Sequence, residues 1–178
     1  MFAPTGRFAW WLPPAGLLGG VMLGIVARWW MRLISTDPEF TWAGTIFIVG
    51  AFGLAGLAQG WAAATRRAGW RRRWTTVARF VAAVLTLPLF TGAGAIMLPT
   101  VVGGSLAFWR PTYHWAVRAV GVLVALPAPL LAGRDIVGDF GWLGGLPRVL
   151  LFGAIYAAVL AAMGSTVATT RPAFTTNQ

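Results

Sequence analysis

The chain has 178 residues, of which 58% are hydrophobic and only 10% are charged, and its mean hydropathy is +0.73. A soluble domain carries roughly 25% charged residues on a surface that must face water. The composition therefore excludes an ordinary soluble domain. It predicts an all-α, polytopic transmembrane helix bundle without a soluble domain.

The net charge is +10, and every basic residue is an arginine. A pI near 12.0 can indicate nucleic-acid binding in a soluble protein. Here the arginines lie beside apolar runs, which favours a cytoplasmic membrane surface with anionic headgroups as the partner, and no nucleic acid. Arginine without lysine, together with many alanines and glycines, is typical of a GC-rich bacterial genome. We therefore expect a multi-pass protein of the bacterial cytoplasmic (inner) membrane.

Tryptophans mark the ends of the first two predicted spans, 12–33 and 42–64. Trp10 and Trp11 precede the first span, and Trp29 and Trp30 stand near its end. At a rise of 1.5 Å per residue the two pairs are roughly 28 Å apart, close to the ~30 Å hydrocarbon core of a bilayer. Tryptophan prefers both interfaces of a membrane, so these pairs indicate where the helix enters and leaves the lipid.

The strongest indication of orientation is an arginine-rich loop after the second span. Arginine is enriched in cytoplasmic loops, so this loop and the N-terminus are expected in the cytoplasm. The loop is interpreted as a topology signal that also contacts the lipid surface. Its basic residues are Arg66, Arg67, Arg71, Arg72 and Arg73, and Arg79 follows one turn into the third span with the same role.

The middle third allows two interpretations. In the favoured one, a third span covers 76–98, and 99–109 is an interfacial or re-entrant piece. In the other, Thr91–Gly94 is a tight turn and both flanking segments cross, although each crossing is then only ~15–17 residues long. Further spans are predicted over 113–132 and 147–167, which gives about five spans, or six in the alternative. A Gly-rich connector covers 133–146, and 171–178 is expected to be a flexible tail.

Charged residues near the predicted outer ends of two spans form a candidate polar cluster. One interpretation is a site for an anionic headgroup or a polyprenyl phosphate, bound through bidentate arginine contacts. The other, which we favour, is that the arginines extend toward the interface and pair with the two carboxylates. The cluster comprises Arg28, Arg32, Asp37, Glu39, Arg110, His114 and Arg118.

Small residues recur at helical spacing on two predicted spans. Such stripes let helices approach closely in lipid, within one bundle, in a homo-oligomer or against a membrane-complex partner. Gln59 is the amide within a predicted span and is expected to hydrogen-bond across helices. The stripes consist of Gly53, Gly56 and Gly60 on one span and Gly153, Ala157 and Ala161 on another.

The sequence contains few residues that could act in catalysis or hold a cofactor or a metal ion. Asp135 and Asp139 are more typical of a salt-bridged loop than of a metal site, because a hard cation needs more oxygen ligands. A single His114 without cysteine makes neither a zinc site nor a bis-histidine haem site. No P-loop and no Gly-x-Ser-x-Gly motif is present. We therefore predict no cofactor, no metal and no catalytic residue.

The run Gly19-Gly20-Val-Met-Leu-Gly24-Ile-Val-Ala-Arg28, followed by Trp42-Ala-Gly44-Thr45-Ile46, resembles the opening of the small dual-topology fluoride channels. The resemblance covers roughly the first third of the chain. The pore asparagine of that family would fall at Gly50 here, and the Thr-rich break in its third helix is missing. What the resemblance implies is two helices packed through glycine, and no site is transferred.

Three functions follow as hypotheses. The favoured one is a non-enzymatic accessory protein, scaffold or complex subunit. The alternatives are a small oligomeric permease or channel, and an outer-leaflet enzyme or carrier that binds a lipid phosphate. Broken helices rich in Pro and Gly often line transport sites, which motivates the permease.

Overall fold

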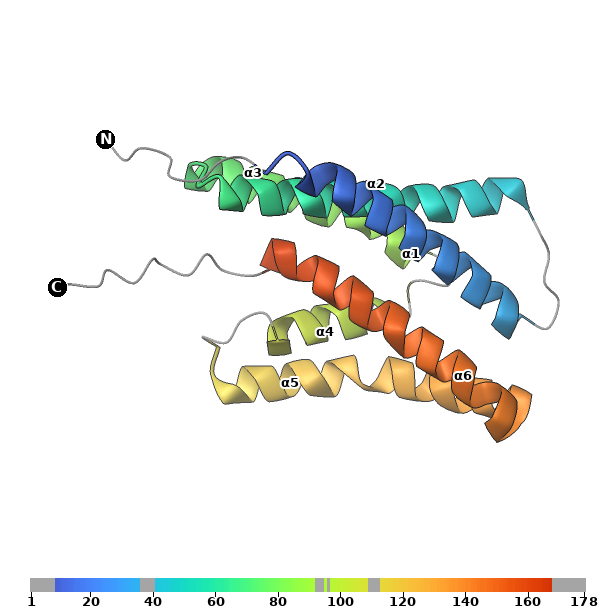
Figure 1. The fold of residues 1–178 in the computed structure, drawn as a ribbon. Coiled ribbons are helices and arrows are strands. Elements are labelled where there is room, and N and C mark those ends of the chain that lie inside the picture. Colours follow the sequence, from blue (N-terminus) through green and yellow to red (C-terminus); the bar gives the residue numbers. More distant parts are fainter. Residues whose placement is uncertain (1–8, 36–40, 92–94, 96, 109–112, 168–178) are drawn as a thin grey trace.

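The computed structural model describes residues 9–35, 41–91, 95, 97–108 and 113–167, and within these ranges the chain is helical with no strand. The all-α bundle predicted from the sequence is confirmed (Figure 1). Its elements are α1 (Leu12–Ile34), α2 (Trp42–Arg67), α3 (Arg72–Thr86), the 3₁₀ turn η1 (Leu87–Phe90), α4 (Leu98–Phe108), α5 (Trp115–Ala125) and α6 (Pro127–Val167).

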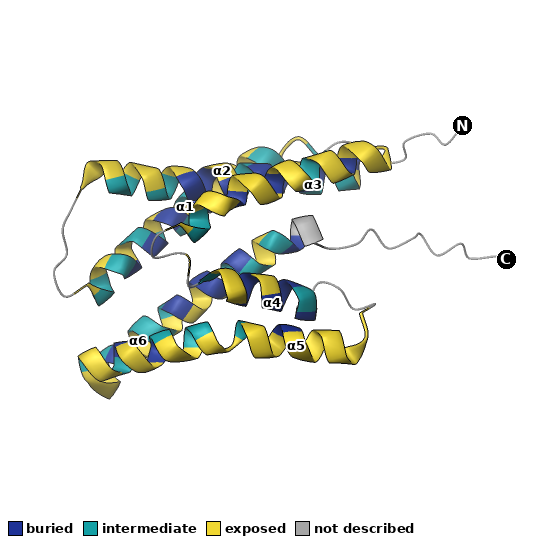
Figure 2. Cartoon of the chain, turned by 180° about the vertical axis from the view of Figure 1, so that it is seen from behind, coloured by how far each residue is buried: buried dark blue, intermediate teal, exposed yellow. Residues whose placement is uncertain are grey.

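Three helical stretches are long and apolar enough to cross a membrane: Leu12–Ile34, Trp42–Arg67 and Trp115–Gly164. Large apolar side chains cover the outside of the bundle, and α5 is exposed along almost its whole length (Figure 2). Leu123 and Leu130, for example, are exposed to 68% and 65%. An exterior of this kind is stable in lipid rather than in water, so the helices indicate a membrane-embedded protein.

The helices run back and forth between two ends of the bundle (Figure 1). At one end, here called the arginine end, α1 begins and α2 passes into α3 through Arg66–Arg73. The same end holds the end of α4, the beginning of α5 and the end of α6. At the opposite end, called the far end, α1 ends, α2 begins and α6 reverses direction at Gly141.

The prediction of one helix over 76–98 is wrong, because α3 and η1 end at Phe90 and the chain then turns back into α4. Pro88 lies within η1 and has no N–H to continue an α-helix. Thr91 and Met97 line a cavity together with Phe47 of α2, so this reversal lies short of the far end.

Segment 99–109, expected at the interface or as a re-entrant piece, largely coincides with α4, which packs inside the bundle. The Thr100 hydroxyl donates to the Ala125 carbonyl at 2.9 Å, which fixes α4 antiparallel to α5. Gly103 and Gly121 bring the two backbones together, since a Cβ on Gly103 would meet the Gly121 carbonyl oxygen. α4 and α5 therefore form a closely packed pair.

The Gly-rich connector predicted over 133–146 is also wrong, since the chain is helical on both sides of a reversal at Gly141. Gly141 has φ 68° and ψ 173°, a backbone conformation that is essentially restricted to glycine. The two halves of α6 then pack antiparallel, and Gly145 lies against Val137. We expected a loop here, but the single glycine Gly141 is enough to reverse the direction of the chain.

Glycines on α1 and α2 bring these two helices into backbone contact. A Cβ added to Gly16 would meet the Gly56 carbonyl oxygen, and one added to Gly20 would meet the Phe52 carbonyl oxygen. A Cβ on Gly60 would meet the Leu12 carbonyl oxygen in the same way. The spacing of four residues places the glycines of α1 on one face, where only a hydrogen fits between the helices.

The core lies between α1, α2, α4 and the second half of α6, and it is built from large side chains. Phe152 stacks on Trp30 with ring centroids 4.6 Å apart and meets Tyr156 edge-on at 4.5 Å. The predicted small-residue stripe Gly153, Ala157 and Ala161 lies instead on the exposed face of α6. The opposite face carries the larger side chains, and burying these forms more van der Waals contacts than burying glycine and alanine would.

The glycine contact gives a direct prediction for stability. Gly56→Ala should destabilise the protein by about 1–3 kcal/mol, because the added methyl group meets the α1 backbone, which cannot rotate away. Thermal unfolding in mild detergent measures the change. Gly50→Ala is the matched control on the same helix: a Cβ there has no neighbour within 4 Å, so its stability should stay level or rise. Equal loss of stability in both variants would contradict the contact.

Candidate functional site

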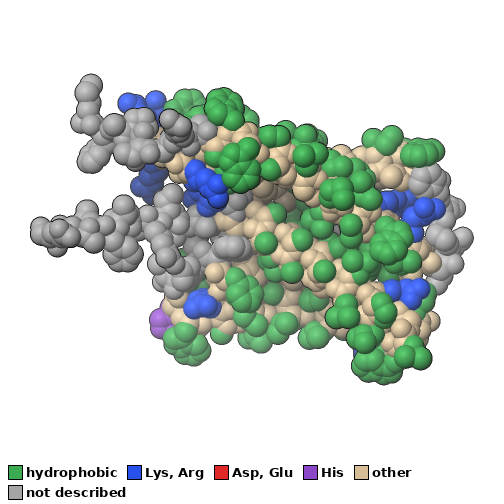
Figure 3. Space-filling view, in the orientation of Figure 1, with side chains coloured by type: hydrophobic (Ala, Val, Ile, Leu, Met, Phe, Trp, Pro, Cys, Tyr) green, Lys and Arg blue, Asp and Glu red, His purple; other side chains and the backbone are tan. Residues whose placement is uncertain are grey.

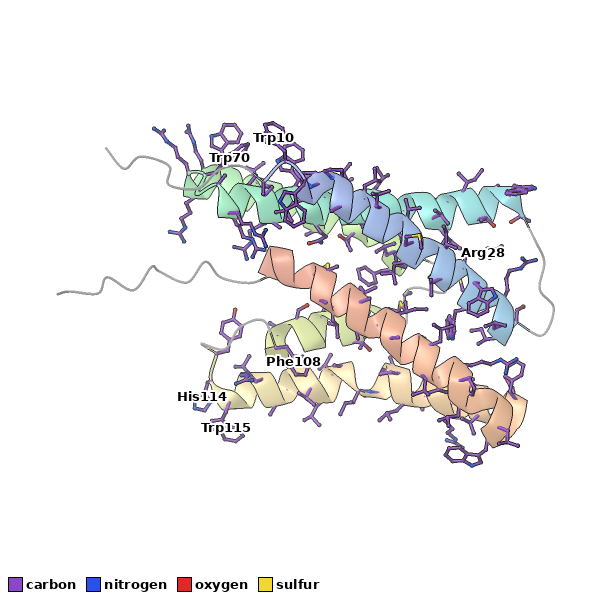
Figure 4. The ribbon with its side chains drawn as sticks, viewed as in Figure 1. Trp10, Arg28, Trp70, Phe108, His114 and Trp115 are labelled. Carbon is purple, nitrogen blue, oxygen red and sulfur yellow. The ribbon has the colours of Figure 1, made fainter. Side chains whose placement is uncertain are left out.

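The predicted outer charge cluster does not form one site in the described part of the chain. Arg28 lies toward the far end and His114 at the arginine end (Figure 4). The Arg28 Nε donates to the Thr45 hydroxyl at 3.2 Å, and that hydroxyl donates to the Thr41 carbonyl at 3.0 Å. Arg28 therefore holds the end of α1 against the beginning of α2. The prediction placed Arg28 and His114 at the same end because it counted an odd number of membrane crossings before His114.

Arg118 and His114 have structural contacts at the arginine end. The Arg118 Nε donates to the Ala107 carbonyl at 2.9 Å, where the last carbonyls of α4 lack helical partners. The His114 Nδ1 accepts the Ala116 N–H at 3.3 Å and so caps α5. Arg32 is exposed in the last turn of α1. The remaining members of the predicted cluster, Asp37, Glu39 and Arg110, lie outside the described residues.

Arg148, which the sequence analysis did not select, joins three parts of the far end. Its Nε donates to the Leu33 carbonyl at 2.9 Å and one of its Nη atoms donates to the Gly144 carbonyl at 2.6 Å. Its guanidinium carbon lies 4.1 Å from the centroid of the Phe140 ring. The Trp30 indole donates to the Arg148 carbonyl at 2.9 Å, so Trp30 points into the bundle rather than marking an interface. The sequence signal that could have identified Arg148 was its position next to Pro147, at one end of a predicted span.

Asp135 and Asp139 lie one turn apart on the first half of α6, and both are exposed. Within the described residues, no group of three or more His, Cys, Asp or Glu side chains is arranged to hold a metal ion. The two carboxylates are at the part of the molecule remote from the arginine end.

The arginine end presents a concentrated positive charge. Figure 3 shows arginine side chains at both ends of the face it displays, and the run Arg66–Arg73 with its five arginines belongs to the arginine end. α2 ends with Gly69 in the left-handed region, at φ 63°. The Trp70 N–H donates to the Thr65 carbonyl and the Gly69 N–H to the Arg66 carbonyl, both at 3.2 Å, which is the Schellman motif. The turn separates Arg66 and Arg67 from Arg71–Arg73 by only a few residues and keeps them at one end.

An apolar groove opens between α1, α2 and α6 on the arginine side of the molecule. Its volume is about 540 Å³, within the ~300–1,000 Å³ usual for ligand pockets. On α1 its lining extends from Leu12 to Leu23, and on α2 from Phe52 to Ala63. Its third wall is the small-residue part of α6 at 158–163. Small residues leave the groove unfilled: a Cβ on Gly19 of α1 would have no neighbour within 4 Å, and α6 contributes Ala158, Ala161 and Ala162 to the lining.

Gln59 and Thr86 are the polar side chains in the lining of the groove. Gln59 is only 5% exposed, and its Nε2 donates to the Thr86 hydroxyl at 3.1 Å. The same nitrogen lies 3.3 Å from the Met163 sulfur, within hydrogen-bond range of this weak acceptor. The expected cross-helix hydrogen bond of Gln59 is therefore present and connects α2 with α3 and α6.

A second, smaller cavity of about 260 Å³ continues along the bundle toward the far end. It is bounded by Ala27–Met31 of α1, by Phe47–Phe52 of α2 and by the α3–α4 reversal. Phe52 and Leu89 line both cavities and so form the partition between them.

Comparisons with protein-family models, with curated proteins and with solved structures found no match to this chain.

The contacts of Arg148 predict a loss of stability at the far end. Arg148→Gln should lower the free energy of unfolding by about 1.5–3 kcal/mol, the usual value of a hydrogen bond to a charged group. Arg134→Gln, an exposed arginine on the same helix, should change it by less than about 0.5 kcal/mol. Thermal unfolding and protease sensitivity near Gly141 provide the measurement. If the two variants behave alike, Arg148 does not hold the far end.

Proposed function

We propose that the chain is a multi-pass protein of the bacterial cytoplasmic membrane, with its arginine end in the cytoplasm. Arginine enrichment in short loops at one end of apolar helices supports this orientation. Because Arg66–Arg73 lie between α2 and α3, the beginning of α1 is then also on the cytoplasmic side.

The arrangement of the helices supports an even number of passes. α3 and α4 enter from the arginine end and return to it, and the two halves of α6 reverse at Gly141 (Figure 1). α6 therefore ends on the side where α1 begins. This favours the even count of the six-pass alternative over five spans, with α3 and α4 as a short pair that turns back before the far end.

A reporter at the C-terminus tests this topology. Green fluorescent protein fused after Gln178 should fluoresce, and alkaline phosphatase at the same position should be inactive, because both are then cytoplasmic. Fusions after Ser35 and after Gly69 serve as the external and cytoplasmic controls. An active phosphatase after Gln178 would favour the five-span interpretation.

Within this topology we propose a non-enzymatic, lipid-binding role, in which the groove between α1, α2 and α6 holds an apolar chain. The observation that carries the proposal is the groove itself, with its open side, its largely apolar lining and its backbone-walled face on α1. A protein of this kind is suited to an accessory or assembly role, because the bound lipid and the helix bundle together form one surface that a partner can contact.

A second candidate is a permease for an apolar molecule. The specific observation favouring it is the second cavity, which lies beyond Phe52 and Leu89 in the direction of the far end. The two cavities together extend from Leu12 to Met31 on α1, roughly 28 Å along the helix and close to the ~30 Å core. Movement of a labelled lipid between leaflets in vesicles containing the protein would separate carriage from static binding.

Filling the groove tests the binding role. Gly19 lines the groove and a Cβ there has no neighbour within 4 Å, so Gly19→Leu should occupy the space without disturbing the helices. Labelling of the α6 wall by a phospholipid with a photoreactive acyl chain should then fall severalfold, as judged by peptide mapping. Gly50→Leu, an exposed and open position outside the groove, should leave labelling unchanged. Equal labelling in both variants would remove the groove as the site.

A further inference from the structure

We infer that the groove selects an anionic phospholipid of the cytoplasmic leaflet, with the headgroup on Arg67 and one acyl chain in the groove between α1, α2 and α6. This inference rests on the proposed function of the groove. It adds which lipid is bound, where its charge lies and which residue recognises it.

The mouth of the groove carries a positioned cation. The Arg67 guanidinium carbon lies 5.7 Å from the centroid of the Trp11 ring, which is a cation–π distance. Trp11 directly precedes Leu12, and Arg67 lies one helical turn beyond Ala63, and both Leu12 and Ala63 line the groove. A headgroup held at Arg67 would therefore stand directly above an acyl chain in the groove.

The charges around the mouth are of one sign. Arg66 and Arg67 are adjacent in the last turn of α2, and Arg71–Arg73 follow directly after the turn at Gly69. In the described part of the chain the carboxylates are Asp135 and Asp139, which belong to the other part of the molecule, on the first half of α6. A cluster of guanidinium groups attracts an anion, and the planar guanidinium of Arg67 can hold a phosphate through two parallel hydrogen bonds.

The depth of the groove matches one leaflet. From Leu12 to Leu23 on α1, and from Ala63 to Phe52 on α2, the lining covers about 17 Å at 1.5 Å per residue. Half of the ~30 Å hydrocarbon core is about 15 Å. Phe52 and Leu89 close the deep end, so an acyl chain that enters at Arg67 ends at the bilayer midplane, as it does in the leaflet itself.

Phosphatidylglycerol and phosphatidylcholine with identical acyl chains separate charge recognition from chain binding. The choline ammonium faces the arginine cluster unfavourably, whereas phosphatidylglycerol keeps its net negative charge. A transmembrane helix of a second copy or of another protein also suits a wall of small residues. That occupant would not distinguish the two lipids, and it would exclude both.

The experiment is native mass spectrometry of the full-length protein in mild detergent, incubated with equal amounts of the two lipids. Wild type should retain phosphatidylglycerol preferentially. Arg67→Gln should reduce that preference about fivefold, the loss expected for one arginine at an anionic surface. Arg67→Lys should keep most of it because the charge remains. Arg32→Gln, which removes an exposed arginine in the last turn of α1 at the far end, should leave the preference unchanged.

Each contrary result has a defined meaning. Equal effects of Arg67→Gln and Arg32→Gln, or no preference in wild type, overturn the headgroup assignment; the groove itself survives if Gly19→Leu still lowers retention of both lipids. If Gly19→Leu matches Gly50→Leu for both lipids, the groove is not the site and the proposed function fails with the inference. A dimer that excludes lipid until it dissociates assigns the groove to a second copy.

Discussion

The backbone contact between α1 and α2 is the constraint on which the rest of the bundle depends. Gly16, Gly20, Gly56 and Gly60 let carbonyl oxygens of each helix approach the partner backbone. In lipid there is little hydrophobic force between helices, so close packing of this kind is what holds them together. Once α1 and α2 are fixed, α6 can cross α1 through Trp30 and Arg148, and α3 can pack on α2 through small residues at Ala58, Ala62 and Ala82.

The sequence was informative where one physical property decides the structure. The composition predicted an all-helical bundle, and the tryptophan and arginine patterns placed the first two helices within a few residues of their observed bounds. The sequence-based prediction failed where a single residue decides the direction of the chain. A turn at Gly141 needs only one positive φ, and Pro88 ends a helix that hydropathy alone would continue to 98. Hydropathy averages over a window and cannot register either event.

The candidate site was predicted less well for a related reason. Placing Arg28 and His114 together required the number of crossings between them, and an error of one crossing moves a residue across the entire membrane. The groove could not be predicted from one helix, because its walls come from three separate segments of the chain, 12–23, 52–63 and 158–163. The Gly16-x-x-x-Gly20-x-x-x-Gly24 spacing on α1 was present in the sequence, and it was the signal that could have indicated a close helix contact.

The reversal at Gly141 has a consequence for how such a chain enters a bilayer. Each return toward the arginine end is made by a short segment: residues 35–41 between α1 and α2, residues 91–97 between η1 and α4, and a single glycine within α6. In the proposed orientation the chain can be inserted as successive helical hairpins. The stretches that must be carried through the hydrocarbon are brief, and the heavily charged segments stay on the side of synthesis. Asp135 and Asp139 then travel within a helix whose partner half follows at once, so their exposure to lipid during insertion is short.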